Sequence, residues 1–316
     1  MSIAEAAPWR DIIGVDVAKG WIDVHWLGCG RAERVEATRP ALARFAAQAS
    51  GGLVVLEASG GYERPLLQAL AKAGVAHALV NPARARAFAQ ATGRLAKTDR
   101  VDARGLAEMG RRLDLEPVPP PDPDRDRLAA LVARRQDLVA MMGAEANRAA
   151  QAHDPGIARQ IAGHLRGLKA QLRLVERQVA TLVQANSALA HAAQRLRSVP
   201  GVGPVVAAIL LARLPELGHL DRRQVAALAG LAPHAQDSGL HKGKRRIKGG
   251  RADLRRALYL AAFVASRHDP RLRTFRARLQ AAGKPTKLAL TACARKLLTT
   301  LNAMLRDGTD YRQQAA

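Results

Sequence analysis

The hydrophobic and polar positions in the first third of the chain change repeatedly between a strand period and a helix period. Short runs rich in β-branched residues predict strands, and the Lys-Gly pair between the first two runs is typical of a hairpin turn. The predicted elements are strands at 12–18, 21–27 and 34–37, a helix at 40–49, a strand at 53–57, a helix at 63–73 and a strand at 75–80. Two further helices, divided near Gly93, complete the order of an RNase H-like α/β layer.

A proline-rich segment marks the end of this first domain. Residues 117–126 contain five prolines, which favour extended polyproline II structure and oppose a helix. We therefore expect an α/β domain at residues 1–116 and a stiff linker at 117–126.

The region after the linker, residues 127–194, has the apolar periodicity of long helices and is interrupted once, at 154–156. Between Ile161 and Leu189 the apolar residues follow a strict 4-3 spacing over four heptads. This spacing predicts a coiled coil, packed either on the preceding helix or on a partner chain, with Asn186 at an a position to fix the register. One core-facing stripe of a bundle helix would give the same pattern.

The charge of the chain points to a polyanionic partner. Fifty Lys and Arg residues against 27 Asp and Glu give a formal net charge of +23. Residues 1–150 carry a net charge of only +3, whereas residues 151–316 carry +20. Nucleic acid is the first expected partner of such a protein, and an anionic membrane surface is the second.

The rest of the composition excludes several classes of protein. Two cysteines are too few for a disulfide framework or a four-ligand zinc site, which fits a reducing cytoplasm. No apolar run reaches 18 residues, and the N-terminus lacks the basic and apolar pattern of a signal peptide. We therefore expect a cytoplasmic protein that is not embedded in a membrane.

Four acidic residues of the first domain could form a metal site. Asp16 lies on the first predicted strand, Glu57 ends the fourth, and Asp99 and Asp102 share one face of a helix. In an RNase H-like layer these elements converge at one edge, where clustered carboxylates would repel one another unless divalent cations bind them. Carboxylate ligands without a histidine or cysteine set favour Mg²⁺, and two such ions can assist phosphodiester chemistry. Each residue alone is ordinary as a structural strand-end or helix-cap carboxylate, and it is the joint arrangement that points to a metal site.

The C-terminal domain, residues 195–316, begins with a sequence that resembles a helix-hairpin-helix. Residues 196–210 (LRSVPGVGPVVAAIL) join two apolar helices through a Pro-Gly-Val-Gly turn. Gly201 and Gly203 would let backbone N–H groups approach a phosphate at the start of the second helix. A plain tight turn between two packed helices is the alternative.

A glycine-rich basic segment follows and carries the strongest local charge. Between Ser238 and Arg256 it has one acid and eight basic residues, for which phosphate contact is the natural explanation. The eight are Lys242, Lys244, Arg245, Arg246, Lys248, Arg251, Arg255 and Arg256. Ser238 stands at its entrance and could act as a nucleophile if nearby cations stabilise the alkoxide, although a turn or cap role is ordinary for a lone serine.

Several of these stretches together resemble the transposases of the insertion-sequence-110 family. The similar stretches are IIGVDVAK (12–19), VVLEASGGYERPL (54–66), NPARARAFA (81–89), KTDRVDARGLA (97–107), SVPGVGPVVAAIL (198–210) and LAGLAPHAQDSG with KGGRADLRRALYLAA (228–262). The resemblance covers nearly the whole chain in the family's order. KTD-x-x-DA and the Ser-Gly pair before the basic loop are its most specific motifs.

The resemblance implies an activity and a set of residue roles. Asp16, Glu57, Asp99 and Asp102 would be the Mg²⁺-binding tetrad of a RuvC-like domain, and Ser238 would be a nucleophile that forms a covalent phosphoserine with DNA. The partners implied are donor and target DNA, a structured bridge RNA that pairs with both, and further copies of the chain, as a dimer or as a tetramer in the active complex.

Two other functions fit parts of the same sequence. A RuvC-like nuclease or junction resolvase would use water as nucleophile and leave Ser238 with a structural role. A non-catalytic, architectural DNA- or RNA-binding protein would need the basic residues but not the four carboxylates. The presence of all four carboxylates speaks against the architectural protein, and a covalent protein–DNA adduct would exclude the water-using nuclease.

Overall fold

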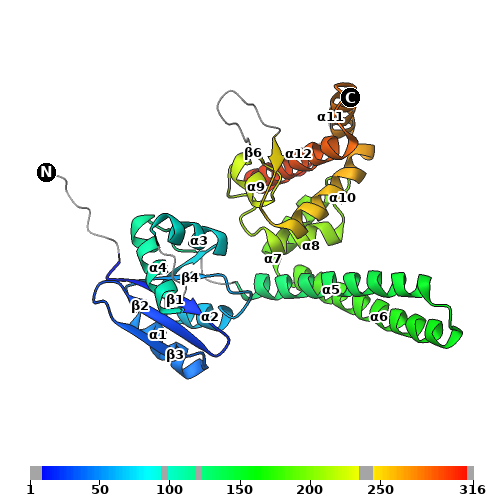
Figure 1. The fold of residues 1–316 in the computed structure, drawn as a ribbon. Helices are drawn as coiled ribbons and strands as arrows, with labels where there is room; N and C mark the ends of the chain where they lie inside the picture. Colours follow the sequence, from blue (N-terminus) through cyan, green and yellow to red (C-terminus); the bar gives the residue numbers. More distant parts are fainter. Residues whose placement is uncertain (1–8, 94–98, 119–121, 235–244, 312–316) are drawn as a thin grey trace. The chain divides into compact units, whose positions relative to one another are not determined.

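The computed structural model describes residues 9–93, 99–118, 122–234 and 245–311, and the chain divides into two compact units. The N-terminal unit is Met1–Pro121 and the C-terminal unit is Asp122–Ala316. Each unit has its own arrangement of helices and strands (Figure 1).

The N-terminal unit is an α/β layer with the predicted order of elements. Its elements are β1 (Ile12–Val17), β2 (Trp21–Trp26), β3 (Ala32–Glu36), α1 (Arg39–Gln48), β4 (Leu53–Glu57), α2 (Arg64–Lys72), β5 (Ala76–Val80), α3 (Pro82–Ala91) and α4 (Asp99–Arg112). The strand order in the sheet is β3-β2-β1-β4-β5. The pairs β1–β2 and β2–β3 are antiparallel, whereas β1–β4 and β4–β5 are parallel. This confirms a mixed sheet, compatible with an RNase H-like domain.

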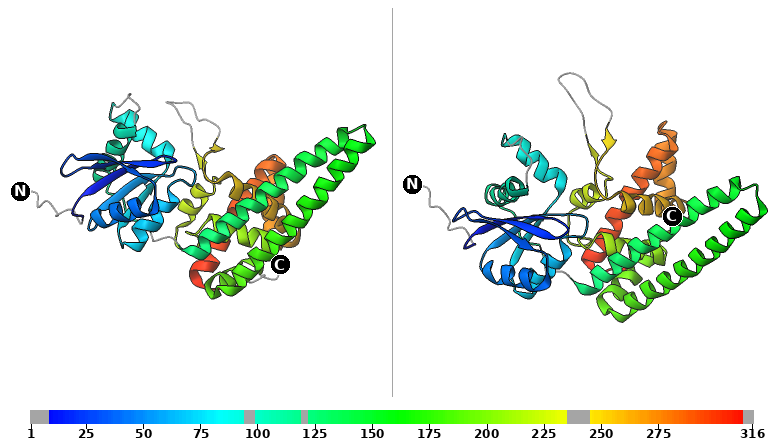
Figure 2. Two further views of the ribbon diagram at one scale, coloured as in Figure 1. Left: turned by 90° about the horizontal axis from the view of Figure 1, so that it is seen from below. Right: turned by 60° about the horizontal axis from the view of Figure 1, so that its bottom comes forward.

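Helices cover both faces of this sheet, because alternate residues of its central strands are apolar on each side. Figure 2 shows α1 and α2 on one face and α3 and α4 on the other. On the first face Phe45 of α1 and Leu70 of α2 pack with Val15 of β1. On the second face Leu106 and Met109 of α4 pack with Val55 of β4.

The C-terminal unit is almost entirely helical. Its elements are α5 (Pro123–Gln151), α6 (Pro155–Ala185), α7 (Ser187–Arg197), α8 (Pro204–Arg213), α9 (Arg222–Leu228), β6 (Pro233–His234), β7 (Arg246–Ile247), α10 (Ala252–His268), α11 (Pro270–Ala281) and α12 (Thr286–Asp307). One core joins the start of α5 and the end of α6 to α7, α8, α10 and α12.

The long helices α5 and α6 form an antiparallel hairpin within one chain (Figure 1). Leu138 of α5 is buried against Leu168 and Val175 of α6, which occupy the predicted d positions. Arg135 of α5 donates to Glu176 of α6 at 2.9 Å. The heptad stripe of α6 therefore packs on the preceding helix of its own chain.

The prediction for Asn186 was wrong. Asn186 has extended backbone angles, ends α6 and begins α7, so it occupies no position of a continuous heptad. Its side chain accepts from the Leu189 N–H at 3.1 Å and donates to Asp124 at 2.8 Å. Asparagine is among the preferred N-cap residues, and this local preference breaks the helix despite the continuous apolar spacing.

The predicted linker at 117–126 was too long. Helix α5 already begins at Pro123, with Asp122 accepting from two N–H groups of its first turn. A proline at the first helical position is compatible with a helix, because the N–H that it lacks has no partner within the helix there. At the other end the Val118 N–H donates to the His77 carbonyl of the edge strand β5 at 2.8 Å.

Within the described part of the chain, none of the helices combines the length and apolar character needed to cross a membrane.

Candidate active site and nucleic-acid interface

Helix α4 crosses β1 at unusually short range, and Gly14 makes this approach possible. A Cβ atom on Gly14 would lie 1.9 Å from the Ala103 carbonyl oxygen and 2.5 Å from the Ala107 nitrogen. At the other end of α4, a Cβ atom on Gly110 would lie 2.9 Å from the side chain of Ile12, the first residue of β1. The helix therefore runs antiparallel to β1, and its first turn lies near the C-terminal end of the strand.

This crossing brings three of the predicted carboxylates to one edge of the sheet. Asp16 follows Gly14 by two residues and so shares the α4 face of β1. Val15 pairs with Leu56 in the parallel register, which places Asp16 and Glu57 next to each other at the strand ends. Asp102 immediately precedes Ala103, the residue that approaches Gly14. Asp16, Glu57 and Asp102 are all half-buried.

The fourth carboxylate begins the same helix. Asp99 is the first residue of α4, one turn before Asp102, and its side chain lies outside the described residues. Among the side chains that are described, no three His, Cys, Asp or Glu residues gather closely enough to hold a metal ion. The oxygen donors and their common edge nevertheless suit a hard divalent cation.

A buried carboxylate that the sequence analysis missed lies opposite Asp16. Asp23 of β2 pairs with Asp16 in the antiparallel register, so both side chains share one face. Asp23 is only 2% exposed, and Arg34 of β3 holds it through two hydrogen bonds of 3.0 and 2.8 Å. Positions 16 and 23 are equally far from the hairpin turn at 19–20, so the sequence alone could have predicted that Asp16 and Asp23 pair across the two strands.

The loop after Glu57 is fixed by a second acid. The Glu63 carboxylate accepts from the Ser59 hydroxyl at 2.8 Å and from the Gly61 N–H at 2.8 Å. Burial alone would raise the pKa of Glu63, but these hydrogen bonds and others from the backbone lower it below its ordinary value. Glu63 therefore stays ionised and orders the segment that directly follows a candidate metal ligand.

The predicted nucleophile falls in a segment of which the structure describes only the two flanks. Ser238, Lys242 and Lys244 lie outside the described residues. The two-residue strands β6 and β7 pair on either side of this segment, with Pro233 opposite Ile247.

Two glycines close the base of the loop behind β6 and β7. A Cβ atom on Gly250 would lie 2.1 Å from the Gly230 nitrogen, so the two backbones touch. The backbone just before Arg251 is therefore packed closely against the backbone at Gly230.

Two of the predicted phosphate-binding arginines make internal bonds. Arg251 donates to both oxygens of Glu216, at 2.7 and 2.8 Å, and to the Arg213 carbonyl. The hydrogen bonds that Arg251 donates to Glu216 raise the pKa of Arg251. Arg255 donates to the Gly249 carbonyl at 2.7 Å. Both residues stabilise the loop base, and any contact of theirs with nucleic acid stays a prediction.

The other described residues of the basic segment are exposed. They are Arg245, Arg246, Lys248 and Arg256. Their guanidinium and ammonium groups are available to solvent, as a phosphate-binding surface requires.

The Pro-Gly-Val-Gly turn joins α7 to α8 as expected, but its first glycine has a packing role. Gly201 has φ +87°, and a Cβ atom there would lie 2.5 Å from the Ala261 carbonyl oxygen of α10. A Cβ atom on Gly203 would meet no heavy atom within 4 Å, so Gly203 is the more open of the two. Gly201 is therefore required for the turn to sit on α10, whatever the turn binds.

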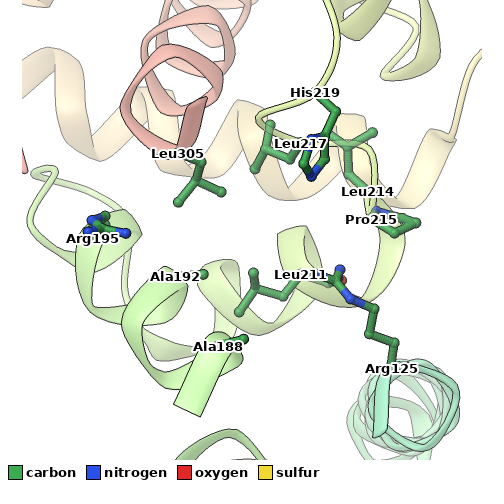
Figure 3. Close-up of a pocket in the computed structure, with 10 residues that line it drawn as sticks. All are labelled: Arg125, Ala188, Ala192, Arg195, Leu211, Leu214, Pro215, Leu217, His219 and Leu305. Carbon is green, nitrogen blue, oxygen red and sulfur yellow. The ribbon is translucent and has the colours of Figure 1, made fainter. Parts of the chain in front are cut away.

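A cavity of about 160 Å³ lies between the start of α5, α7, the end of α8 and the end of α12. Figure 3 shows Leu211, Leu214 and Leu217 around it, with Arg125 and Arg195 at opposite margins. The ten residues that line it in the described structure include no carboxylate, serine or cysteine. It is therefore not a candidate for the phosphoryl-transfer site.

Two family models match the chain in separate regions. A model described as a transposase, of the DEDD type of IS110, matches residues 13–154. A model described as the transposase IS116/IS110/IS902 family matches residues 193–277. The first region contains all four carboxylates of the predicted tetrad, and the second contains Ser238 and the basic segment.

Individual proteins from several bacteria are similar to the chain. An insertion element IS110 protein of Streptomyces coelicolor is 37% identical over 162 residues, which is 49% of this chain and 38% of that protein. A pilin gene-inverting protein of Moraxella bovis is 28% identical over 267 residues, covering 82% of this chain and 81% of that protein. A pilin gene-inverting protein of Moraxella lacunata is 27% identical over the same length.

Proposed function

The chain belongs to the IS110 family of transposases, and we propose that it cleaves and exchanges DNA strands by phosphoryl transfer. One observation carries the proposal: the close crossing of α4 over Gly14 brings Asp16, Glu57 and Asp102 to the same sheet edge. The relatives named for gene inversion, which align over most of the chain, support strand exchange in place of simple cleavage.

The four carboxylates are the residues that would hold the metal. Asp16 and Glu57 would approach from the sheet and Asp99 and Asp102 from α4, so the ligands come from two elements locked together by packing. A bound pair of Mg²⁺ ions would supply positive charge to the attacking and leaving oxygens of a phosphodiester. The buried Asp23–Arg34 pair keeps the neighbouring strand rigid opposite Asp16.

Ser238 is the proposed nucleophile. Its hydroxyl oxygen would form an ester bond to the backbone phosphorus while the bond from phosphorus to one sugar oxygen breaks. The serine proton leaves, and the released sugar oxygen takes up a proton. The exposed cations that flank the loop, Arg245 and Arg246, would lie near the phosphate charge. The rival is a nuclease in which water takes the place of the serine hydroxyl.

The remaining parts of the proposal concern partners. We expect the substrates to be donor and target DNA, selected by a structured bridge RNA that pairs with both, as the family resemblance implies. We expect the active form to be a dimer or tetramer acting in the cytoplasm. Co-purification of an RNA encoded beside the gene, protected from nuclease by the protein, would support the guide. Recombination by RNase-treated protein on naked DNA would exclude it.

An Asp16→Asn variant tests the proposed chemistry. Loss of one metal-ligand charge should abolish strand exchange and leave DNA binding nearly unchanged, because the predicted phosphate-binding residues lie in the other unit. Glu36→Gln is the matched control, since Glu36 is an exposed acid on the edge strand β3 of the same unit. Recombination by Asp16→Asn at the rate of Glu36→Gln would exclude the tetrad.

A further inference from the structure

The helices α10, α11 and α12 carry a second concentration of positive charge, beyond the basic segment that precedes them. Between Ala257 and Leu305 the sequence has nine basic residues and a single acid, Asp269. The nine are Arg267, Arg271, Arg273, Arg276, Arg278, Lys284, Lys287, Arg295 and Lys296. A region of this size has no need of so large an excess of positive charge for folding.

The single acid can offset only one of these positive charges, and its two oxygens already accept hydrogen bonds within the fold. Asp269 is only 2% exposed and caps α11, where one oxygen accepts from the Arg271 N–H at 2.9 Å. The other oxygen accepts a hydrogen bond from the Tyr311 hydroxyl. Burial and this hydrogen bond raise the pKa of Tyr311 to about 12, so the hydroxyl remains a donor.

Aromatic rings hold several of these cations close together. The Lys296 Nζ lies 4.7 Å and the Arg278 guanidinium 5.4 Å from the centre of the Phe275 ring. The Arg267 guanidinium lies 4.1 Å from the centre of the Phe263 ring. Ring faces attract cations, so they fix the positions of side chains that would otherwise move apart.

The α11 cation cluster consists of Arg267, Arg271, Arg273, Arg276, Arg278 and Lys296. Within the described residues, none of its members forms an ion pair with a carboxylate. The Arg273 guanidinium instead donates to the Arg267 carbonyl at 2.6 Å, which brings two cationic residues together. The buried Nε atoms of Arg271 and Arg276 have no hydrogen-bond partner in the described structure. Such a cluster repels itself unless an anion binds.

We propose that the α11 cation cluster is a second phosphate-binding surface, which contacts the backbone of duplex DNA separately from the basic segment at 242–256. Helix α11 has 12 residues and is therefore about 18 Å long. Duplex DNA carries roughly one charge per 1.7 Å of its axis, so α11 spans on the order of ten phosphate charges. The exposed Arg273 and Arg278 are the members best placed to contact them.

DNA is the polyanion on which transposases of this family act. The inference rests on the proposed function only for this choice of DNA as the ligand. We expect contacts without sequence preference, because contacts to phosphates carry no direct sequence information.

The test measures DNA binding by the full-length protein in EDTA, where strand cleavage does not interfere. The variant is Arg273→Gln with Arg278→Gln, and the control is Arg173→Gln with Arg177→Gln on α6. The control removes the same charge from two exposed positions one turn apart. Fluorescence anisotropy with a 30-base-pair duplex of arbitrary sequence gives the affinity across a salt series, and circular dichroism confirms that each variant is folded.

The slope of log binding constant against log salt concentration is negative, and we expect the α11 variant to reduce its magnitude by about 1.8, because two phosphate contacts are lost. Binding at 0.1 M salt should weaken many-fold. The control should change neither by more than a small fraction of this. Equal slopes for the two variants would overturn the inference while leaving the proposed function intact. A larger effect on duplex RNA of the same sequence than on DNA would overturn the choice of DNA. Failure of the unaltered protein to bind any duplex would instead contradict the proposed function.

Discussion

Replacing Gly14 by alanine tests how α4 positions its carboxylates. The added Cβ atom would lie 1.9 Å from the Ala103 carbonyl oxygen, whereas an ordinary contact is 3.4–4 Å. The obstacle is helix backbone, so the first half of α4 has to move away from β1 by more than about 1 Å. Gly14 lies in a regular strand with no positive φ, so steric overlap and not backbone strain is the cause.

The expected cost can be estimated from the two opposing effects. Overpacking of a rigid core costs about 1–3 kcal/mol and occasionally more. Alanine also restricts the conformations of the unfolded chain, which increases the unfolding free energy by about 0.4–1 kcal/mol. We therefore expect the N-terminal unit to lose roughly 2 kcal/mol of unfolding free energy. Because Asp102 adjoins Ala103, we also expect recombination to slow by about 100-fold, the usual effect of a 1 Å misplacement.

The assay can observe this unit alone. All three tryptophans, Trp9, Trp21 and Trp26, lie in the N-terminal unit, so tryptophan fluorescence in urea reports its unfolding. Gly20→Ala is the matched control, because nothing lies within 4 Å of a Cβ atom at Gly20. A Gly14→Ala protein as stable and as active as Gly20→Ala would refute the close crossing and the placement of Asp102 that follows from it.

Three further substitutions test the C-terminal unit. Gly201→Ala should destabilise the unit by several kcal/mol, because φ is positive there and α10 blocks the Cβ atom. Gly203→Ala is the control and should leave the melting temperature unchanged. Equal melting temperatures for the two variants, measured by circular dichroism, would contradict this. Burial alone would raise the pKa of Glu216, but the hydrogen bonds from Arg251 lower it. The ionised Glu216 therefore stabilises the folded protein above the ordinary glutamate pKa, and this stabilisation is lost as the pH falls through the lowered pKa. Glu216→Gln should therefore cost about 1–2 kcal/mol at pH 7 and progressively less below about pH 4 in urea titrations, and a difference that does not depend on pH would show that the ion pair is not its source. Asn302→Ala should cost about 2–4 kcal/mol, because the buried Asn302 side chain bonds the Gly218 N–H and the Leu220 carbonyl at 2.8 Å each; a loss below about 1 kcal/mol would show that water replaces both bonds.

The fold of the N-terminal unit could be predicted from the sequence because its signals are local. Strand residues alternate or run apolar, and the glycine and proline residues between them mark turns, so the observed bounds differ from the predicted ones by only one or two residues. The same strand order placed Asp16 and Glu57 at neighbouring strand ends. Asp23 was missed because the hairpin register, which relates it to Asp16, was not followed across the turn.

Long-range contacts explain what the sequence could not predict. The heptad spacing continues through Asn186, but this residue ends α6 as the N-cap of α7, and its side chain also bonds to Asp124, 62 residues away. Arg251 was predicted to bind phosphate because it lies among basic residues. Its internal partner Glu216 is 35 positions earlier in the chain, so the sequence near Arg251 does not reveal the ion pair. Gly14 gave no signal at all in its strand, since only the approach of α4 requires a glycine.

One measurement tests the central claim most directly: detection of a covalent protein–DNA adduct. Full-length protein is incubated with Mg²⁺, its RNA and end-labelled element DNA, then denatured and separated by electrophoresis. We expect labelled protein with a phosphoester at Ser238 by mass spectrometry, no adduct from Ser238→Ala, and none from Asp16→Asn. Strand cleavage by Ser238→Ala, with no adduct from the unaltered protein, would contradict the account and identify a nuclease that uses water.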